Sequence, residues 1–357
     1  MKIINNLLLI CFLTISTSIY SSENFDKWIV VTTIQSPTPQ LKKMAKMAEW
    51  HMVVVGDKKT PKDWSLENCD YLSPDDQMKL GYELTALLPW NHYSRKNIGY
   101  LYAIEHGATL IYETDDDNEP ISNLDPLPEE SVLSSVISDA NCVNIYSYFG
   151  IPDIWPRGFP LEIIGKKTGN VIILPPSSCL VGIEQGIVNQ EPDLDAIYRL
   201  ARDDSLFFKK MLACYLPTGT YCPFNSQNTF FHKSLFASLY IPSSVSMRVS
   251  DIWRGYIAEK LLEKTGRVIA FSGPNAIQLR NPHNYFEDFL LEKDLYFKSG
   301  KLVSFLQNWK IDDLQDPMDV MPKLYKSLID ENFIEARETP LLKAWINDLK
   351  KVGFNSY

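Results

Sequence analysis

Three consecutive aspartates, Asp115–Asp117, follow a short apolar run in the segment IYETDDDN. Neighbouring carboxylates repel one another, so the arrangement suits a site that receives positive charge. If the segment is extended, Asp115 and Asp117 point to one face and Asp116 points away. Two carboxylates on one face suit Mg²⁺ or Mn²⁺, which prefer oxygen ligands and leave positions open for phosphate oxygens. A solvated acidic turn is the alternative interpretation.

Two basic residues, Arg95 and Lys96, stand at the predicted start of a helix over 94–108, which Ser94 would cap and Gly107 would end. Cations at this end oppose the helix dipole, but together with free N–H groups they would bind an anion such as a diphosphate. Two solvated basic residues are the alternative. Neither glycine-rich phosphate loop motif occurs, so a diphosphate would have to be held by metal and by Arg or Lys.

The segment VSDIWRG places Asp251 close to a tryptophan and an arginine. Such an acid could act as a general base, or it could bind sugar hydroxyls while Trp253 stacks on a sugar face. An N-capping aspartate beside a core tryptophan is the alternative. Asp193 and Asp195, in EPDLDAIYR, are ligand-binding candidates on a similar footing.

The elements that must position these residues alternate between strand and helix. β-Branched runs predict strands, and the segments LKKMAKMAEW and 94–108 have helical spacing between them. The predicted strands are 27–34, 51–59 and 109–114. This order predicts βαβ units and a mostly parallel sheet, whose ligands bind outside the carboxyl ends of the strands. Asp57 and Asp115–Asp117 should therefore meet at one edge.

Composition and charge exclude some classes of function. The 357 residues carry a net charge of −9, which argues against a nucleic-acid-binding protein. The cysteines have no CxxC spacing and the histidines no HxH or HExxH spacing, so zinc is not expected. Residues 1–22 have an apolar run and small polar residues, which predict a secretory signal peptide or an uncleaved signal anchor. The remainder would then face a lumen or the exterior.

Several segments together resemble the STELLO-like proteins, which are Golgi-associated probable glycosyltransferases. These segments are WIVVTTI, VVVGDKK, YLSPDDQ, LLPWNHYSRKNIGYLYAIEHGA, IYETDDDN, FNSQNTFFHKSLF, VSMRVSDIWRGYIAEKLL and AWINDLKKVGF. The resemblance runs from about residue 27 to the C-terminus and implies an α/β, GT-A-like (Rossmann-like) fold with a D-x-D motif at Asp115–Asp117. PDLDAIYRL and DIWRG are also similar to the reversibly glycosylated polypeptides, which are UDP-arabinopyranose mutases.

The resemblance and the residue patterns together assign roles. Asp115 and Asp117 are the expected metal ligands, and Asp251 is the expected catalytic base. The expected ligand-binding residues are Asp57, Arg95, Lys96, Asp116, Asp193 and Asp195. Plant members of the family carry an N-terminal cytosolic part with a membrane anchor, whereas here a short leader precedes the domain.

We therefore expect a metal-dependent glycosyltransferase that uses Mn²⁺ or Mg²⁺ and a nucleotide sugar, most simply UDP-linked, with a glycan or another hydroxyl compound as acceptor. It would act in the secretory pathway or Golgi lumen, with a membrane contact only through the leader. The expected division is a leader (1–22), a GT-A-like domain (24–285) and a helical C-terminal region (286–357). A catalytically silent scaffold and a UDP-sugar mutase-like isomerase are the alternatives.

Overall fold

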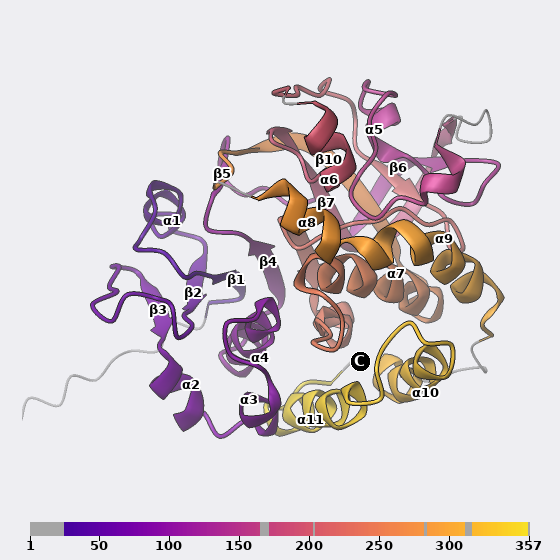
Figure 1. The fold of residues 1–357 in the computed structure, drawn as a ribbon. Coiled ribbons are helices and arrows are strands. Elements are labelled where there is room, and N and C mark those ends of the chain that lie inside the picture. The colour runs from indigo at the N-terminus through magenta and orange to yellow at the C-terminus, as the bar shows by residue number, and fades with distance from the viewer. Residues whose placement is uncertain (1–24, 165–170, 203, 282–283, 311–315, 356–357) are drawn as a thin grey trace, which may run out of the picture.

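A ten-stranded sheet is the framework of the part of the chain that the structure describes (Figure 1). This computed structural model describes residues 25–164, 171–202, 204–281, 284–310 and 316–355. The strand order is β3-β2-β1-β4-β9-β7-β6-β8-β10-β5. The strands are β1 Lys27–Thr32, β2 His51–Val55, β3 Cys69–Leu72, β4 Leu110–Thr114, β5 Asn118–Pro120, β6 Glu130–Ile137, β7 Ile172–Gln190, β8 Cys214–Leu216, β9 Asn228–His232 and β10 Val268–Gln278.

The helices connect the strands in the first half and follow one another at the C-terminal end. They are α1 Pro39–Met44, α2 Pro74–Lys79, α3 Glu83–Leu87, α4 Lys96–Glu105, α5 Ile145–Tyr148, α6 Ala196–Ala201, α7 Met247–Thr265, α8 Tyr285–Leu291, α9 Lys293–Asn308, α10 Pro317–Asp330 and α11 Glu338–Lys351. The described residues also form the 3₁₀ helices η1 Tyr93–Arg95, η2 Leu161–Ile163 and η4 Lys233–Leu239.

The strands β3, β2, β1 and β4 form the parallel half of the sheet. Their aliphatic residues are buried on both faces, as expected where helices cover a parallel sheet. The helix α1 packs on one face through Leu41, and α4 packs on the other through Ile98. A Cβ at Gly99 would lie 2.7 Å from Val30 and 2.8 Å from Val55, so glycine allows α4 to approach the sheet this closely.

The second half of the sheet is mixed. The strand β9 runs antiparallel to β4 and to β7, and β7 runs antiparallel to β6 but parallel to β10. The predicted α/β class with a central sheet and flanking helices is confirmed. The contiguous parallel part of the sheet consists of β3, β2, β1 and β4. Antiparallel neighbours need no helical crossover, which is why the Pro- and aromatic-rich middle of the chain shows no βαβ pattern.

The predicted helix over 94–108 begins differently from expectation. A short 3₁₀ turn, η1, precedes α4, and the side chain of His92 accepts the capping hydrogen bond from the Ser94 N–H group. Ser94 itself is therefore not the cap. Gly107 follows the helix in a left-handed conformation with φ of +92°, in agreement with its predicted place at the helix end.

The C-terminal helices pack against both halves of the molecule (Figure 1). Asp348 on α11 accepts hydrogen bonds from the N–H groups of Glu83 and Leu84 at the start of α3, both at 2.9 Å. Buried Glu338 accepts from the backbone N–H groups of Ser243 and Ser244. These contacts fix α11 to the parallel half and to the segment before α7. The division of the chain at residue 286 stays a prediction.

The predicted leader, residues 1–22, lies outside the described residues. Within the described part of the chain, no helix combines the length and the apolar character that a membrane crossing requires. The five cysteines that follow the leader are free thiols in this structure.

Candidate active site

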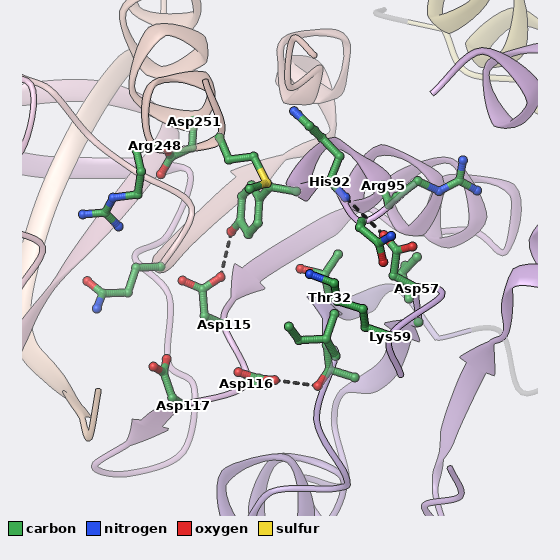
Figure 2. A pocket seen from close by; sticks show the side chains of 18 of the residues that line it. Thr32, Asp57, Lys59, His92, Arg95, Asp115, Asp116, Asp117, Arg248 and Asp251 are labelled. Atoms are coloured by element: carbon green, nitrogen blue, oxygen red, sulfur yellow. Dashed lines mark hydrogen bonds between the residues drawn. The ribbon is translucent and has the colours of Figure 1, made fainter. Parts of the chain in front are cut away.

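A cavity of about 430 Å³ opens at the carboxyl ends of β1, β2 and β4 (Figure 2). Thr33 follows β1, Asp57 follows β2 and Asp115–Asp117 follow β4, and all of them line the cavity. The predicted meeting of Asp57 and the three aspartates at one sheet edge is therefore what the structure shows. The other wall is lined by Arg157, Asp193, Met247, Arg248 and Asp251, and Gln278 and Arg280 lie between this wall and Asp117.

The acidic turn, Asp115–Asp117, presents all three residues to the cavity. Asp115 accepts a hydrogen bond from the Tyr93 hydroxyl at 2.7 Å. Asp116 accepts from the Thr33 hydroxyl at 2.5 Å. The segment is not extended as the predicted alternation assumes, because β4 ends at Thr114 and the aspartates form a turn rather than a strand. Asp116 alone bonds to Thr33, after β1.

Asp117 lies at the far end of this turn, where β5 begins beside β10. Its carboxylate accepts from the Gln278 side-chain amide at 3.1 and 3.2 Å and from the Asn281 N–H group at 3.3 Å. The turn thus spans from β4, inside the sheet, to the edge formed by β10 and β5.

The acidic turn has little positive charge to compensate it. Burial raises the pKa of Asp116 to about 6, although the Thr33 hydroxyl opposes the rise, and the neighbouring Asp117 and Asp115 add to it. Burial and Asp115 also raise the pKa of Asp117. The cation nearest to Asp115 is Lys96, whose Nζ lies 3.3 Å from its carboxylate. The charge of Arg280 also acts on Asp117, so three carboxylates face two cations and an excess of negative charge remains at the cavity.

A divalent cation would compensate this excess charge if it binds together with a phosphate ligand. The described residues contain no cluster of three or more His, Cys, Asp or Glu side chains that could hold a metal by themselves. Nucleotide sites commonly bind Mg²⁺ through one or two carboxylates, with substrate phosphates and water completing the coordination. Asp115 and Asp117 could supply these two carboxylates, and the cation would then bind together with its phosphate ligand.

Arg95 and Lys96, the predicted diphosphate-binding pair, are buried and already bonded. The Arg95 guanidinium donates to the side chain of Gln77 and to the Thr85 carbonyl, and it stacks on Trp90. Figure 2 shows this guanidinium directed away from the acidic turn. The Lys96 ammonium donates to the carbonyls of Thr114 and Ser226. Both cations therefore support the strand ends, and neither extends a free charged group to the cavity.

Asp57 forms the wall beside β2, next to His92 and Lys59 (Figure 2). Its carboxylate accepts from the Lys58 N–H group at 2.6 Å and from the His92 N–H group at 3.2 Å. Burial, together with the charge of Arg337, lowers the pKa of His92 to about 4. This wall consequently combines the Asp57 carboxylate, the side chain of Lys59 and an imidazole that is neutral at pH 7.

Asp251 and Asp193 share one buried arginine, Arg157. The guanidinium donates to both oxygens of Asp251, at 3.2 and 2.9 Å, and to Asp193 at 2.7 Å. Arg157 holds the pKa of Asp193 well below its ordinary value, although burial works in the opposite direction. Asp195 does not join this group: it caps α6 and accepts from the Trp155 indole at 2.6 Å.

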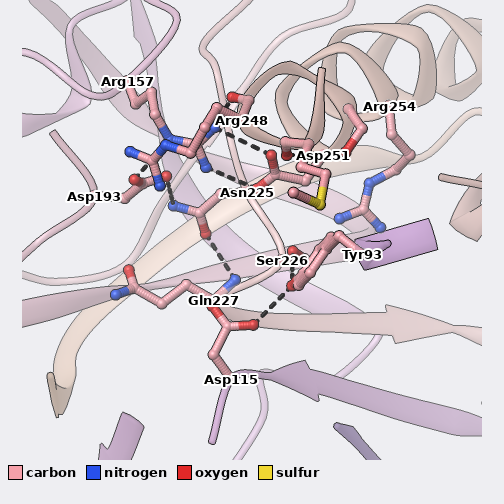
Figure 3. A network of polar contacts seen from close by, with 12 residues as sticks. Tyr93, Asp115, Arg157, Asp193, Asn225, Ser226, Gln227, Arg248, Asp251 and Arg254 are labelled. Atoms are coloured by element: carbon pink, nitrogen blue, oxygen red, sulfur yellow. Dashed lines mark hydrogen bonds and ion pairs between the residues drawn. The ribbon is translucent and has the colours of Figure 1, made fainter. Parts of the chain in front are cut away.

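Buried polar residues connect the two walls of the cavity (Figure 3). The Asn225 side chain donates to Asp193 at 2.8 Å and accepts from the Gln227 N–H group at 3.0 Å. The Gln227 side chain donates to Gln278, which in turn donates to Asp117. The sequence FNSQNTFF was recognised above as a family segment, but it carried no signal that assigned these residues to the site.

Arg157, Arg248 and Arg280 are further site residues that sequence reasoning missed. Each is a single arginine without a motif, and they are separated by long stretches of chain. The position of Arg280 just after a strand, β10, is the one local signal, because the residues that follow strands often line ligand sites.

The fold and this cavity define a class of protein. A βαβ half with an acidic turn at its carboxyl edge, extended by a mixed sheet and flanked by helices, is consistent with a GT-A-like glycosyltransferase fold. A family model for STELLO glycosyltransferases matches residues 248–357, which include α7 to α11.

Two relatives from Arabidopsis thaliana match almost the whole chain. Probable glycosyltransferase STELLO1 is 34% identical over 95% of this chain and 46% of its own length. Probable glycosyltransferase STELLO2 is 32% identical over the same shares. The chain thus carries a STELLO glycosyltransferase match, and its predicted resemblance to this family is confirmed. It spans about half the length of these curated relatives.

Proposed function

We propose that this protein is a metal-dependent glycosyltransferase whose donor is a nucleotide sugar, most simply a UDP-sugar. The observation that carries the proposal is the acidic turn, Asp115–Asp117, which is partly buried in a cavity at the carboxyl edge of a parallel sheet with too little positive charge around it. The glycosyltransferase names of the family and of both relatives support the same reaction class.

Different residues of the cavity would bind the metal and the nucleoside. Asp115 and Asp117 would hold Mn²⁺ or Mg²⁺, which when bound neutralises the charge of the departing diphosphate. Asp116 and Asp57 would contact the nucleoside, because both lie on the side of the cavity where β1 and β2 end. The neutral His92 would add no charge to this part of the cavity, which Lys59 also lines.

Asp251 remains the proposed base that would accept the acceptor hydroxyl proton. Both of its oxygens are occupied by Arg157, so this assignment requires the ion pair to open when the acceptor binds. Asp193 would help to hold Arg157 during this opening.

The cellular location is also part of the proposal. We place the protein in the secretory pathway or Golgi lumen, on the basis of the apolar leader in residues 1–22. The acceptor would be a glycan or another hydroxyl compound.

The test is a panel of UDP-sugars incubated with the purified protein and Mn²⁺, with released UDP and the carbohydrate product both measured. We expect metal-dependent UDP release with at least one sugar, and its loss after addition of a chelator. Thermal unfolding with UDP and Mn²⁺ should show a higher midpoint, because a ligand that binds the native state stabilises it. No stabilisation and no turnover would contradict the proposal and favour a silent scaffold. An isomerised UDP-sugar formed without acceptor would favour a mutase.

A further inference from the structure

Arg280 is a buried arginine whose hydrogen-bonding capacity is largely unused. It follows β10 and lines the cavity, and its side chain is 7% exposed. Its Nε and Nη1 atoms are buried without a hydrogen-bond partner. The nearest recorded carboxylate, that of Asp193, lies 4.0 Å from Nη2, which is beyond hydrogen-bond distance. A buried donor without an acceptor is costly, so this arrangement favours the binding of an external acceptor.

Two neighbouring arginines of the cavity, Arg157 and Arg248, already have carboxylate partners. Arg157 is bonded to Asp193 and Asp251. Arg248 is bonded to Glu292 at 2.6 Å. Arg280, by contrast, has no carboxylate of the described residues within hydrogen-bond distance. Of Arg157, Arg248 and Arg280, Arg280 is therefore the one whose guanidinium is available for a ligand.

The position of Arg280 links it to the acidic turn. The residues on either side of it bond to Asp117: the Leu279 N–H group donates to its carbonyl and the Asn281 N–H group to its carboxylate, both at 3.3 Å. The proposed metal-binding aspartate and this arginine therefore share one short backbone segment. A ligand that carries negative charge and binds a cation at Asp117 has Arg280 beside it.

We propose that Arg280 is the receptor for an oxyanion of the ligand, namely the terminal phosphate of a nucleoside diphosphate. The inference rests on the proposed function and gives its diphosphate the cationic partner that Arg95 and Lys96 do not supply. A guanidinium presents a planar fork of N–H donors that matches phosphate and carboxylate oxygens, so a sugar carboxylate shares the same chemistry. Ligands that differ in their number of phosphates show whether Arg280 binds a phosphate or a sugar carboxylate.

The test compares the binding of uridine, UMP, UDP and UDP-glucuronate to the full chain with Mn²⁺, by calorimetry. The variants are Arg280→Gln, which removes the charge, and Arg280→Lys, which keeps it. We expect Arg280→Gln to weaken UDP binding roughly tenfold to a hundredfold, the effect of losing charge-assisted hydrogen bonds. Uridine and UMP should bind as before, and Arg280→Lys should recover part of the loss. Lys326→Gln, at an exposed ion pair on α10, is the control.

The outcomes separate this inference from the function on which it rests. Unchanged UDP affinity in Arg280→Gln, together with loss in Asp117→Asn, would overturn the inference and leave the proposed function standing. A loss confined to UDP-glucuronate would keep the oxyanion site but overturn the phosphate as its source. If the unaltered protein binds no nucleotide, the proposed function fails, and Arg280-dependent binding of inorganic pyrophosphate then decides whether the oxyanion site exists. Equal thermal midpoints of the variants show that the fold is kept.

Discussion

The two walls of the cavity differ in the groups that contact their buried carboxylates. On the wall formed by the acidic turn, Asp116 and Asp117 accept hydrogen bonds from a hydroxyl, an amide side chain and a backbone N–H group, all of which are neutral. On the opposite wall, Asp193 and Asp251 are paired with Arg157. The carboxylates of the first wall have no hydrogen-bonded arginine among the described residues, whereas the carboxylates Asp193 and Asp251 of the second wall are paired with Arg157. Ligand binding is therefore expected where compensation is incomplete, and stability where it is complete.

The largest effect should come from removing charge on the acidic wall. We expect Asp117→Asn to lower metal-dependent UDP release on the order of a thousandfold, because a catalytic metal contributes several kcal/mol to the stabilisation of developing charge. The amide keeps the shape of the side chain, so the thermal midpoint should not fall. Exposed Asp125→Asn is the matched control and should retain full activity. Full activity of Asp117→Asn would show that the contrast between the walls does not govern catalysis.

On the second wall the same kind of change should act on folding. We expect Arg157→Met to lower the free energy of unfolding by roughly 3–5 kcal/mol, because Asp193 and Asp251 would remain buried without their partner. Urea unfolding at pH 7 measures this loss. The triple variant with Asp193→Asn and Asp251→Asn should recover much of it, since it leaves no uncompensated charge. A cost below about 1 kcal/mol for the single change would mean that this wall is not held by the arginine.

Glu184 on β7 is a buried carboxylate outside the cavity, and its hydrogen-bond donors are neutral. It therefore shows the effect of burial without a paired cation. Burial raises its pKa from 4.5 to about 7, although the Ser272 hydroxyl and the Leu127 N–H group oppose the rise. A folded-state pKa above the unfolded value stabilises the protein below pH 4.5, and this contribution is lost as the pH rises through 7. Relative to Glu184→Gln, the unaltered protein should lose about 3 kcal/mol over this interval. Parallel stability curves for the two proteins would contradict this.

The smallest effect is expected where solvent compensates the charges. Lys326 and Asp330 form an ion pair of 2.7 Å on α10, and their side chains are 76% and 60% exposed. We expect Lys326→Ala to change the free energy of unfolding by less than about 0.5 kcal/mol. The same urea experiment measures it. A larger loss would show that exposure does not separate strong from weak pairs in this molecule.

The sequence was informative where structure is local. The strands β1, β2 and β4 are contiguous aliphatic runs, and the polar residues that follow them, such as Asp57 and Asp115, must lie at one edge once the sheet is parallel. The geometry of the turn could not be predicted from the sequence. It depends on the residue at which β4 ends, and the apolar pattern does not mark that residue. The extended conformation assumed for Asp115–Asp117 is therefore not the one that the structure shows.

The pairing of charges was beyond the reach of sequence reasoning. Arg95 looked like a free cation at a helix start, but Gln77, eighteen residues earlier, binds it in the folded chain. Arg157 meets Asp251 across 94 positions of sequence. No periodicity connects residues at such separations, and only the tertiary fold decides which arginine is satisfied and which, like Arg280, is not. The assignment of roles to Asp57, Asp193 and Asp251 stays a prediction.

The bond between Asp348 and the start of α3 has a consequence for biosynthesis. The partners are 264 and 265 positions apart, so the first βαβ units leave the ribosome long before their partner helix is made. During this interval the apolar surface that α11 later covers is open to chaperones, and bringing together partners so distant along the chain slows the final assembly.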